Sequence, residues 1–209
     1  MNSFGMIRVS EKLHISIFSF FALLFFFSGQ GFAYSLLFLT SALLHEASHL
    51  LFLHRYGAKI RSVTLYPFGV DICADTSRLS YKKELICTLA GCLANAFLAA
   101  TSCLALYFYP SVHLLFFMLC NTFLGVFNLI PLSFFDGGKA LRLIIYDRFD
   151  IDRAFYIHKA LDIASAVTFL CFSFFIMAGS DFNLSVICVV IYASLSTFAL
   201  YIKIPCREP

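Results

Sequence analysis

Residues 85–135 read LICTLAGCLANAFLAATSCLALYFYPSVHLLFFMLCNTFLGVFNLIPLSFF and contain no Asp, Glu, Lys or Arg. A helix that crosses about 30 Å of bilayer hydrocarbon needs about 20 apolar residues. This run is long enough for two such helices, and Tyr109-Pro110-Ser111 divides it because proline cannot continue a helix. The sequence therefore predicts transmembrane helices at about 84–108 and 112–130.

The same criterion applied to the rest of the chain gives four further helices, at about 12–28, 32–54, 154–177 and 183–202. Gly29-Gln30-Gly31 and Gly179-Ser180-Asp181 separate the members of each pair. We therefore expect an all-α membrane protein, a polytopic bundle of about six transmembrane helices. Residues 1–209 are expected to form a single membrane-embedded domain without a soluble regulatory domain.

The composition supports a membrane location. Hydrophobic residues make up 61% of the chain and charged residues only 13%, and the mean hydropathy is +0.88. A soluble domain carries roughly 25% charged residues. Such a composition excludes intrinsic disorder, and a net charge of +3 leaves no basic face for nucleic acid. The eight Cys residues include no Cys-x-x-Cys pair and are expected to act as small apolar residues.

The 15 Lys and Arg residues indicate the orientation. With six spans, all of them lie in or at the edge of the segments on one side: the N-terminus, residues 55–83 and 131–153, and the C-terminal tail. Positively charged loops stay on the cytoplasmic side. We expect a multi-pass integral membrane protein with both termini in the cytoplasm.

The second predicted helix contains His45-Glu46-Ala47-Ser48-His49. Residues four apart lie on one face of a helix, so both imidazoles can reach one ion. Zinc favours imidazole nitrogen, and a catalytic zinc has three protein ligands and an open position. His-Glu-x-x-His on a helix is the metalloprotease pattern, in which the glutamate acts as base.

The alternative is a polar cluster that only packs helices together. A carboxylate at the centre of a membrane helix costs roughly 2.5 kcal/mol or more, and such residues mark function by default. Glu46 has two histidines at ligand spacing beside it, which favours the metal site.

A third ligand is needed, and Asp136 is the main candidate. It ends the uncharged run and precedes Gly137-Gly138, which allow a tight turn behind the carboxylate. The alternative for Asp136 is a cap on a helix over Lys139–Tyr146, and Asp162 is the rival ligand.

Three motifs together resemble the site-2 protease family of intramembrane zinc metalloproteases, peptidase family M50. They are His45-Glu46-x-x-His49, Ala90-Gly91-Cys92-Leu93-Ala94-Asn95, and Asn128-x-x-Pro131 followed by Asp136-Gly137-Gly138. With Tyr66-Pro67-Phe68-Gly69-Val70, the layout looks most like the stage IV sporulation protein FB branch, without the nucleotide-sensing CBS domain that many of its members carry.

The resemblance implies one zinc ion per chain, held by His45, His49 and Asp136, with Glu46 as the catalytic base. It also implies that Asn95 and Asn128 bind the substrate backbone or the developing oxyanion. Packing between helices is the alternative role for both asparagines.

Residues 59–70 alternate in part and turn at Pro67-Phe68-Gly69, which predicts a short β-hairpin on the cytoplasmic side, between helices 2 and 3. Its edge would bind an extended substrate by strand addition. A plain loop with topogenic charges is the alternative.

These observations lead to a functional hypothesis: a zinc endopeptidase that cleaves a membrane-associated regulatory protein near the cytoplasmic face. The sporulation resemblance implies a sigma-factor precursor as substrate, with membrane inhibitor proteins as partners, and no nucleotide. The alternative hypotheses are a catalytically inactive scaffold that binds membrane proteins and a metal transporter. Transport predicts ionisable residues at several depths, whereas here they gather on one side.

Overall fold

The computed structural model describes residues 6–8, 13–16, 31–66, 69–133 and 135–179. The chain divides into two compact units, Met1–Val126 and Phe127–Pro209. Each unit is described below by itself. The prediction of a single domain over 1–209 stays a prediction.

Helix α2 covers Phe32–Arg55, as the sequence predicted for the second span. Gly31 precedes it with a φ of 82°, in the left-handed region that favours glycine. His54 and Arg55 occupy the last turn, where positive charge interacts well with the helix dipole.

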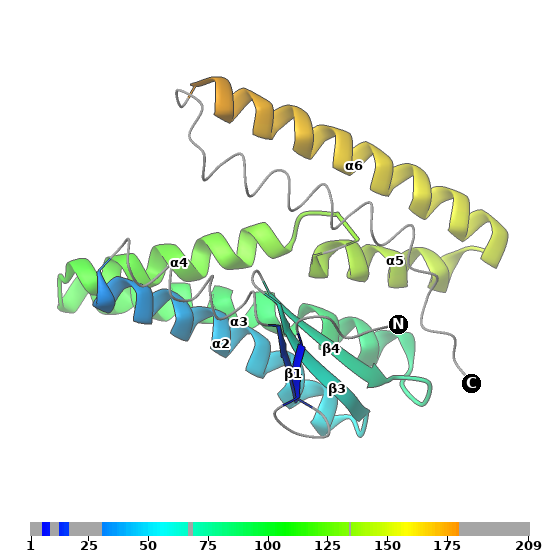
Figure 1. Cartoon of the computed structure of the whole chain (residues 1–209), viewed down its shortest axis with the longest axis horizontal. Helices are drawn as coiled ribbons and strands as arrows, with labels where there is room; N and C mark the ends of the chain where they lie inside the picture. Colours follow the sequence, from blue (N-terminus) through cyan, green and yellow to red (C-terminus); the bar gives the residue numbers. More distant parts are fainter. Residues whose placement is uncertain (1–5, 9–12, 17–30, 67–68, 134, 180–209) are drawn as a thin grey trace. The chain divides into compact units, whose positions relative to one another are not determined.

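The uncharged run forms two helices, α3 (Tyr81–Phe108) and α4 (Val112–Asn128), with the predicted break at Tyr109–Ser111. Helix α3 starts one turn earlier than expected, and Glu84 lies in its first turn. Helices α2 and α3 pack against each other (Figure 1).

A four-stranded sheet accompanies these helices in the first unit. Its strands are β1 (Met6–Arg8), β2 (Leu13–Ser16), β3 (Lys59–Tyr66) and β4 (Gly69–Asp75), in that spatial order. Strands β3 and β4 form the predicted hairpin, antiparallel from Lys59↔Asp75 to Tyr66↔Gly69. Strand β2 runs parallel to β3, and β1 antiparallel to β2.

The prediction of a helix from about residue 12 is wrong at its start, because Leu13–Ser16 forms strand β2. The backbone of this segment pairs with Val63–Leu65 of β3, a long-range partner that no local pattern reveals. A short apolar run cannot be assigned to helix or strand from its composition alone. The sheet is thus larger than the expected hairpin.

Residues 17–30 and 180–209, which contain the rest of the first predicted helix and all of the sixth, lie outside the described residues. The count of six spans is therefore not confirmed. Within the described part, three helices are long and apolar enough to cross a membrane: Phe32–Arg55, Tyr81–Phe108 and Ile151–Cys171. Helix α4 is apolar but shorter.

The second unit contains α5 (Asp136–Arg148) and α6 (Ile151–Gly179), which contact each other. Helix α6 confirms that the segment predicted at about 154–177 is helical. The ring of Phe127 lies 4.8 Å from that of Phe135 and 6.1 Å from that of Phe169, between centroids. These contacts tie the start of the unit to α6.

The interior of the first unit is polar at several points, whereas its outer surface is apolar. Ser35, Ser41, Asn95 and Asn121 have no exposed surface, but the side chain of Phe97 is 69% exposed. Small and polar residues between helices, with large apolar residues outside, are typical of helices packed in lipid.

Candidate metal centre

His45 and His49 lie one turn apart on α2, and both are buried. Their Nε2 atoms are 3.2 Å apart, and the ring planes are inclined at 75°. The two ε nitrogens therefore point to a common position, as the four-residue spacing predicts. This geometry fits two imidazole ligands of one ion, which bind it from adjacent corners of its coordination shell.

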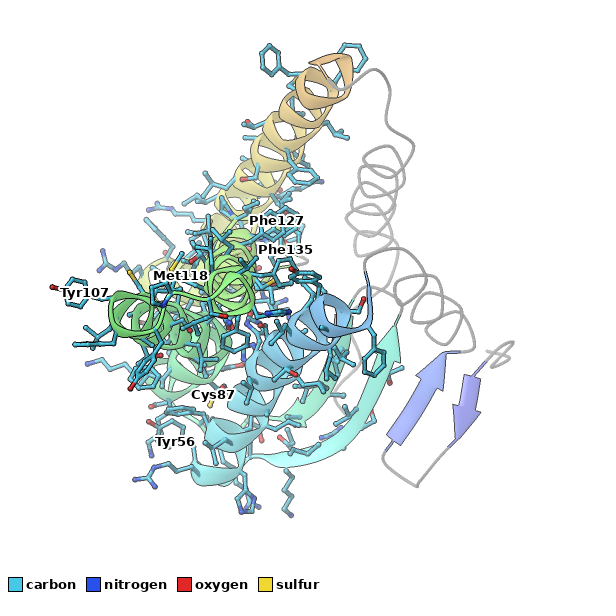
Figure 2. All side chains as sticks on the ribbon, turned by 90° about the vertical axis from the view of Figure 1, so that its left-hand side faces the viewer. Tyr56, Cys87, Tyr107, Met118, Phe127 and Phe135 are labelled. Atoms are coloured by element: carbon cyan, nitrogen blue, oxygen red, sulfur yellow. The ribbon has the colours of Figure 1, made fainter. Side chains whose placement is uncertain are left out.

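Helix α3 holds the opposite nitrogens of the same rings. Nδ1 of His49 lies 2.8 Å from the main-chain carbonyl oxygen of Cys87, and Nδ1 of His45 lies 3.1 Å from the side-chain amide nitrogen of Asn95. Figure 2 labels Cys87 on α3 beside the ribbon of α2. Metal-binding histidines characteristically use their second nitrogen for such an outer hydrogen bond.

Gly91 lies between these two contacts on α3, four residues from each. A Cβ atom at Gly91 would lie 2.6 Å from Nε2 and from Cε1 of His45, and closer still to Nε2 of His49. A side chain here would occupy the space into which both Nε2 atoms point. Cys87, Gly91 and Asn95, called the α3 stripe below, thus hold the rings and leave room at their metal-binding atoms.

Glu46 follows His45 on α2 and is partly exposed. It therefore lies one residue from the histidine pair, on a rigid helix and with access from outside. This placement suits a group that exchanges protons with water.

Asp136 belongs to the second unit, where it is the first residue of α5 and is buried. Phe135, not Asp136, occupies the N-cap position, and its side chain makes no capping hydrogen bond. Nζ of Lys139 lies 3.5 Å from Oδ1 of Asp136. The alternative interpretation made Asp136 the cap of a helix over Lys139–Tyr146. This interpretation is wrong about the start of the helix, because α5 begins at Asp136 itself.

Gly137 and Gly138 pack directly on the preceding loop. A Cβ on Gly137 would collide with the carbonyl group of Leu129, and one on Gly138 with that of Leu132. These two glycines allow the backbone to fold back tightly before α5, which places the carboxylate of Asp136 at a fixed turn.

Asp162, the rival ligand, has a different partner. Its Oδ1 accepts a hydrogen bond of 2.8 Å from the backbone N–H of Ser133, whose hydroxyl lies 3.4 Å from Nε2 of His158. Asp162 is buried in α6 and anchors the loop that leads to Asp136. The sequence showed that Asp162 lies within an apolar helix, but it could not show that this side chain accepts a hydrogen bond from the backbone of Ser133.

The predicted substrate-binding residues belong to different elements. Asn128 ends α4 and is partly exposed, and Gly69 starts β4 opposite Tyr66. Pro67 and Phe68 lie outside the described residues. Asn95 has no exposed surface, and its amide contacts His45.

One solved structure resembles this chain over nearly its full length. It is the site-2 protease from Methanocaldococcus jannaschii, with a TM-score of 0.71 over 98% of each chain and 22% sequence identity. The chain shares the fold of that structure. In this fold the histidine pair of α2 faces the α3 stripe described above.

Two sequence comparisons point in the same direction. The model of peptidase family M50 matches residues 110–172, which contain α4, α5 and most of α6 and therefore Asp136, but not the histidine pair. Zinc metalloprotease MJ0392 from Methanocaldococcus jannaschii is 31% identical over 121 residues, which cover 54% of this chain and 34% of the relative. The chain thus spans about a third of the curated relative that it matches.

Proposed function

We propose that this chain is a member of peptidase family M50 and an intramembrane zinc endopeptidase. The observation that carries the proposal is the histidine pair: two buried Nε2 atoms 3.2 Å apart, each ring held at Nδ1 from a second helix, with no side chain at Gly91 to fill the space before them. The resemblance to a site-2 protease in fold and to family M50 in sequence supports the proposal.

His45, His49 and Asp136 would hold one zinc ion, each offering one ligand atom. Two neutral imidazoles and one carboxylate are a frequent ligand set of a catalytic zinc, and they leave a fourth position open. When bound, zinc lowers the pKa of water towards about 7 and polarises the substrate carbonyl.

Glu46 is the general base in this proposal. It takes a proton from the attacking water and gives it to the leaving amine nitrogen, so that the peptide bond is hydrolysed without net transfer of protons to the enzyme. General acid–base catalysis of this kind contributes typically about 10²–10⁴-fold to the rate.

The substrate would be a membrane-associated regulatory protein that is cut near the cytoplasmic face. A helical substrate must unwind, because its carbonyl groups are bonded within the helix. An extended segment can pair with a sheet edge. In the described sheet, β3 is flanked by β2 and β4, so the free edge of this hairpin is that of β4. Asn128, at the partly exposed end of α4, remains the candidate for binding the substrate backbone.

The finer predictions on biology rest on the resemblance alone. They are a sigma-factor precursor as substrate, as in the stage IV sporulation protein FB branch, and membrane inhibitor proteins as regulators. The proposed cytoplasmic location of both termini rests instead on the distribution of Lys and Arg. The second functional hypothesis is an inactive scaffold. Glu46 beside the histidine pair favours the enzyme, since a scaffold has no use for a base at a metal site.

The test compares the purified full-length protein with Glu46→Gln and His45→Ala in detergent. Zinc content and cleavage of a panel of single-span membrane proteins are measured. We expect zinc in the wild type and in Glu46→Gln, cleavage by the wild type alone, and loss of both properties in His45→Ala. Zinc binding without cleavage by any form favours the scaffold, and absence of zinc from the wild type overturns the proposal.

A further inference from the structure

The α3 stripe offers the two imidazoles different hydrogen-bond partners. His49 contacts a main-chain carbonyl oxygen, that of Cys87, which can only accept a hydrogen bond. Nδ1 of His49 must therefore carry the proton and donate it, and Nε2 then keeps its lone pair. A neutral imidazole with this tautomer binds a metal through Nε2.

At the same ring position, His45 faces a side-chain amide. Its Nδ1 lies 3.1 Å from the side-chain amide of Asn95, a group that offers donors at one end and an acceptor at the other. With the amide nitrogen towards the ring, Asn95 donates to Nδ1, and the proton of His45 is then on Nε2. That proton would point at Nε2 of His49, 3.2 Å away, where a metal ion has to bind.

Rotation of the Asn95 amide by 180° exchanges its two ends. The side-chain oxygen then faces Nδ1 of His45 and accepts its proton, and Nε2 is free to bind a metal. The oxygen in question, Oδ1, is buried and has no hydrogen-bond partner among the described residues. A proton on Nδ1 of His45 would satisfy this acceptor, while the amide N–H groups would move to the position where Oδ1 had no partner. The need of a bound metal for a free Nε2 on His45 therefore favours the rotated amide.

We propose that Asn95 is a positioning residue that selects the metal-binding tautomer of His45 by presenting its side-chain oxygen to Nδ1. This inference rests on the proposed zinc site and assigns Asn95 a role different from substrate binding. Its amide works through His45 and touches neither the ion nor the substrate. The proposal predicts that metal affinity requires a hydrogen-bond acceptor at position 95, and not merely a side chain of this size.

The chain offers a matched control for this requirement. Asn121 on α4 also has no exposed surface, and its amide nitrogen donates to the hydroxyl of Ser41 at 3.0 Å. Asn121 contacts no ring of the histidine pair through any hydrogen bond that the described residues show. Replacing either asparagine by leucine removes a buried amide of the same size from the same unit.

The experiment measures zinc affinity by competition with a chelator for the full-length wild type, Asn95→Leu, Asn95→Asp and Asn121→Leu. Loss of an outer hydrogen-bond partner weakens metal binding by about 10–100-fold. We expect this loss in Asn95→Leu, a change of less than about tenfold in Asn121→Leu, and wild-type or tighter binding in Asn95→Asp, whose carboxylate can only accept.

A spectroscopic measurement reports the tautomer directly. With ¹⁵N-labelled histidine, the zinc-free wild type and Asn95→Asp should show His45 with its proton on Nδ1, and zinc-free Asn95→Leu should lose this preference. A role in packing alone would not change the tautomer signal. If Asn95→Leu does not fold, the comparison of Asn95→Asp with the wild type still decides the question.

Two results overturn the inference: wild-type zinc affinity in Asn95→Leu, or losses of equal size in Asn95→Asp and Asn95→Leu. Either result leaves zinc binding and cleavage by the wild type intact. Absence of zinc from the wild type contradicts the proposed function instead, so the two failures are distinguishable.

Discussion

Gly91 lies so close to His45 that a Cβ atom on the glycine would be 2.6 Å from Nε2 of the imidazole. Real Cβ atoms do not approach other atoms this closely, so one of the two helices or the ring would have to move. Interiors are packed at high density and do not absorb such a shift freely. The smallest residue at this position is thus part of the candidate metal centre.

Gly91→Ala should therefore abolish zinc binding, because the added methyl group occupies the space in front of both Nε2 atoms. Zinc content after purification checks this expectation. Gly125→Ala is the graded control: its Cβ would lie 3.3 Å from Cβ of Asn95, which requires a shift of only a few tenths of an ångström. Equal zinc content in Gly91→Ala and the wild type would contradict the arrangement of α2 and α3 described above.

The anchor formed by Asp162 and Ser133 should stabilise the second unit. Asp162→Leu leaves the backbone N–H of Ser133 without its acceptor, and an unsatisfied buried donor costs about 1–3 kcal/mol. Asp162→Asn keeps an acceptor oxygen and should cost less. Thermal unfolding of both variants in detergent measures the difference.

Asp152→Asn serves as the control for this anchor, because Asp152 is an exposed residue in the first turn of the same helix. Loss of its charge from the first turn of the helix should cost at most about 0.3–1 kcal/mol, less than the loss expected in Asp162→Leu. If Asp162→Leu unfolded at the same temperature as Asp152→Asn, the hydrogen bond to Ser133 would have no role in stability.

Much of the helical part of the fold could be predicted because lipid requires long uncharged segments. Tyr109–Ser111 divides α3 from α4 as expected, and α2 matches its predicted range. Strand β2 escaped prediction because its partner, β3, lies more than 40 residues further on. Pairing over such a distance leaves no local pattern in Leu13–Ser16.

The candidate site was predictable where chemistry depends on residue type and spacing, as for His45 and His49. The contacts of their Nδ1 atoms were not, since one partner is the main-chain oxygen of Cys87, which every residue carries. The predicted substrate role of Asn95 rested on a resemblance, and its contact with His45 became visible only in three dimensions.

The hydrogen bond between Asn121 of α4 and Ser41 of α2 should make a modest contribution to helix packing. Ser41→Ala removes one acceptor, but the Asn121 amide nitrogen keeps a bond of 2.9 Å to the carbonyl oxygen of Phe117. Hydrogen bonds between membrane helices contribute about 0.6 kcal/mol on average. We expect a loss of this order in unfolding experiments, with unchanged zinc affinity.

Ser48→Ala is the matched control on the same helix. Among the described residues, the hydroxyl of Ser48 donates within α2, to the carbonyl oxygen of Leu44 at 2.7 Å. Its stability should stay close to that of the wild type. A loss in Ser41→Ala no larger than in Ser48→Ala would show that the contact with α4 is energetically neutral.

Asp75, at the end of β4, should titrate at unusually low pH. The hydroxyl of Ser77 is the largest cause, followed by the guanidinium of Arg61 at 3.1 Å, and together with the backbone N–H of Ser77 they lower the pKa of Asp75 to about 2. Because the pKa is depressed in the folded protein, the stabilisation is present above the unfolded value of 3.8 and is lost as the pH falls towards 2. Carboxyl chemical shifts measured against pH should show Ser77→Ala raising the pKa more than Arg61→Ala; the reverse order would mean that the guanidinium of Arg61, not the hydroxyl of Ser77, is the main cause of the low pKa.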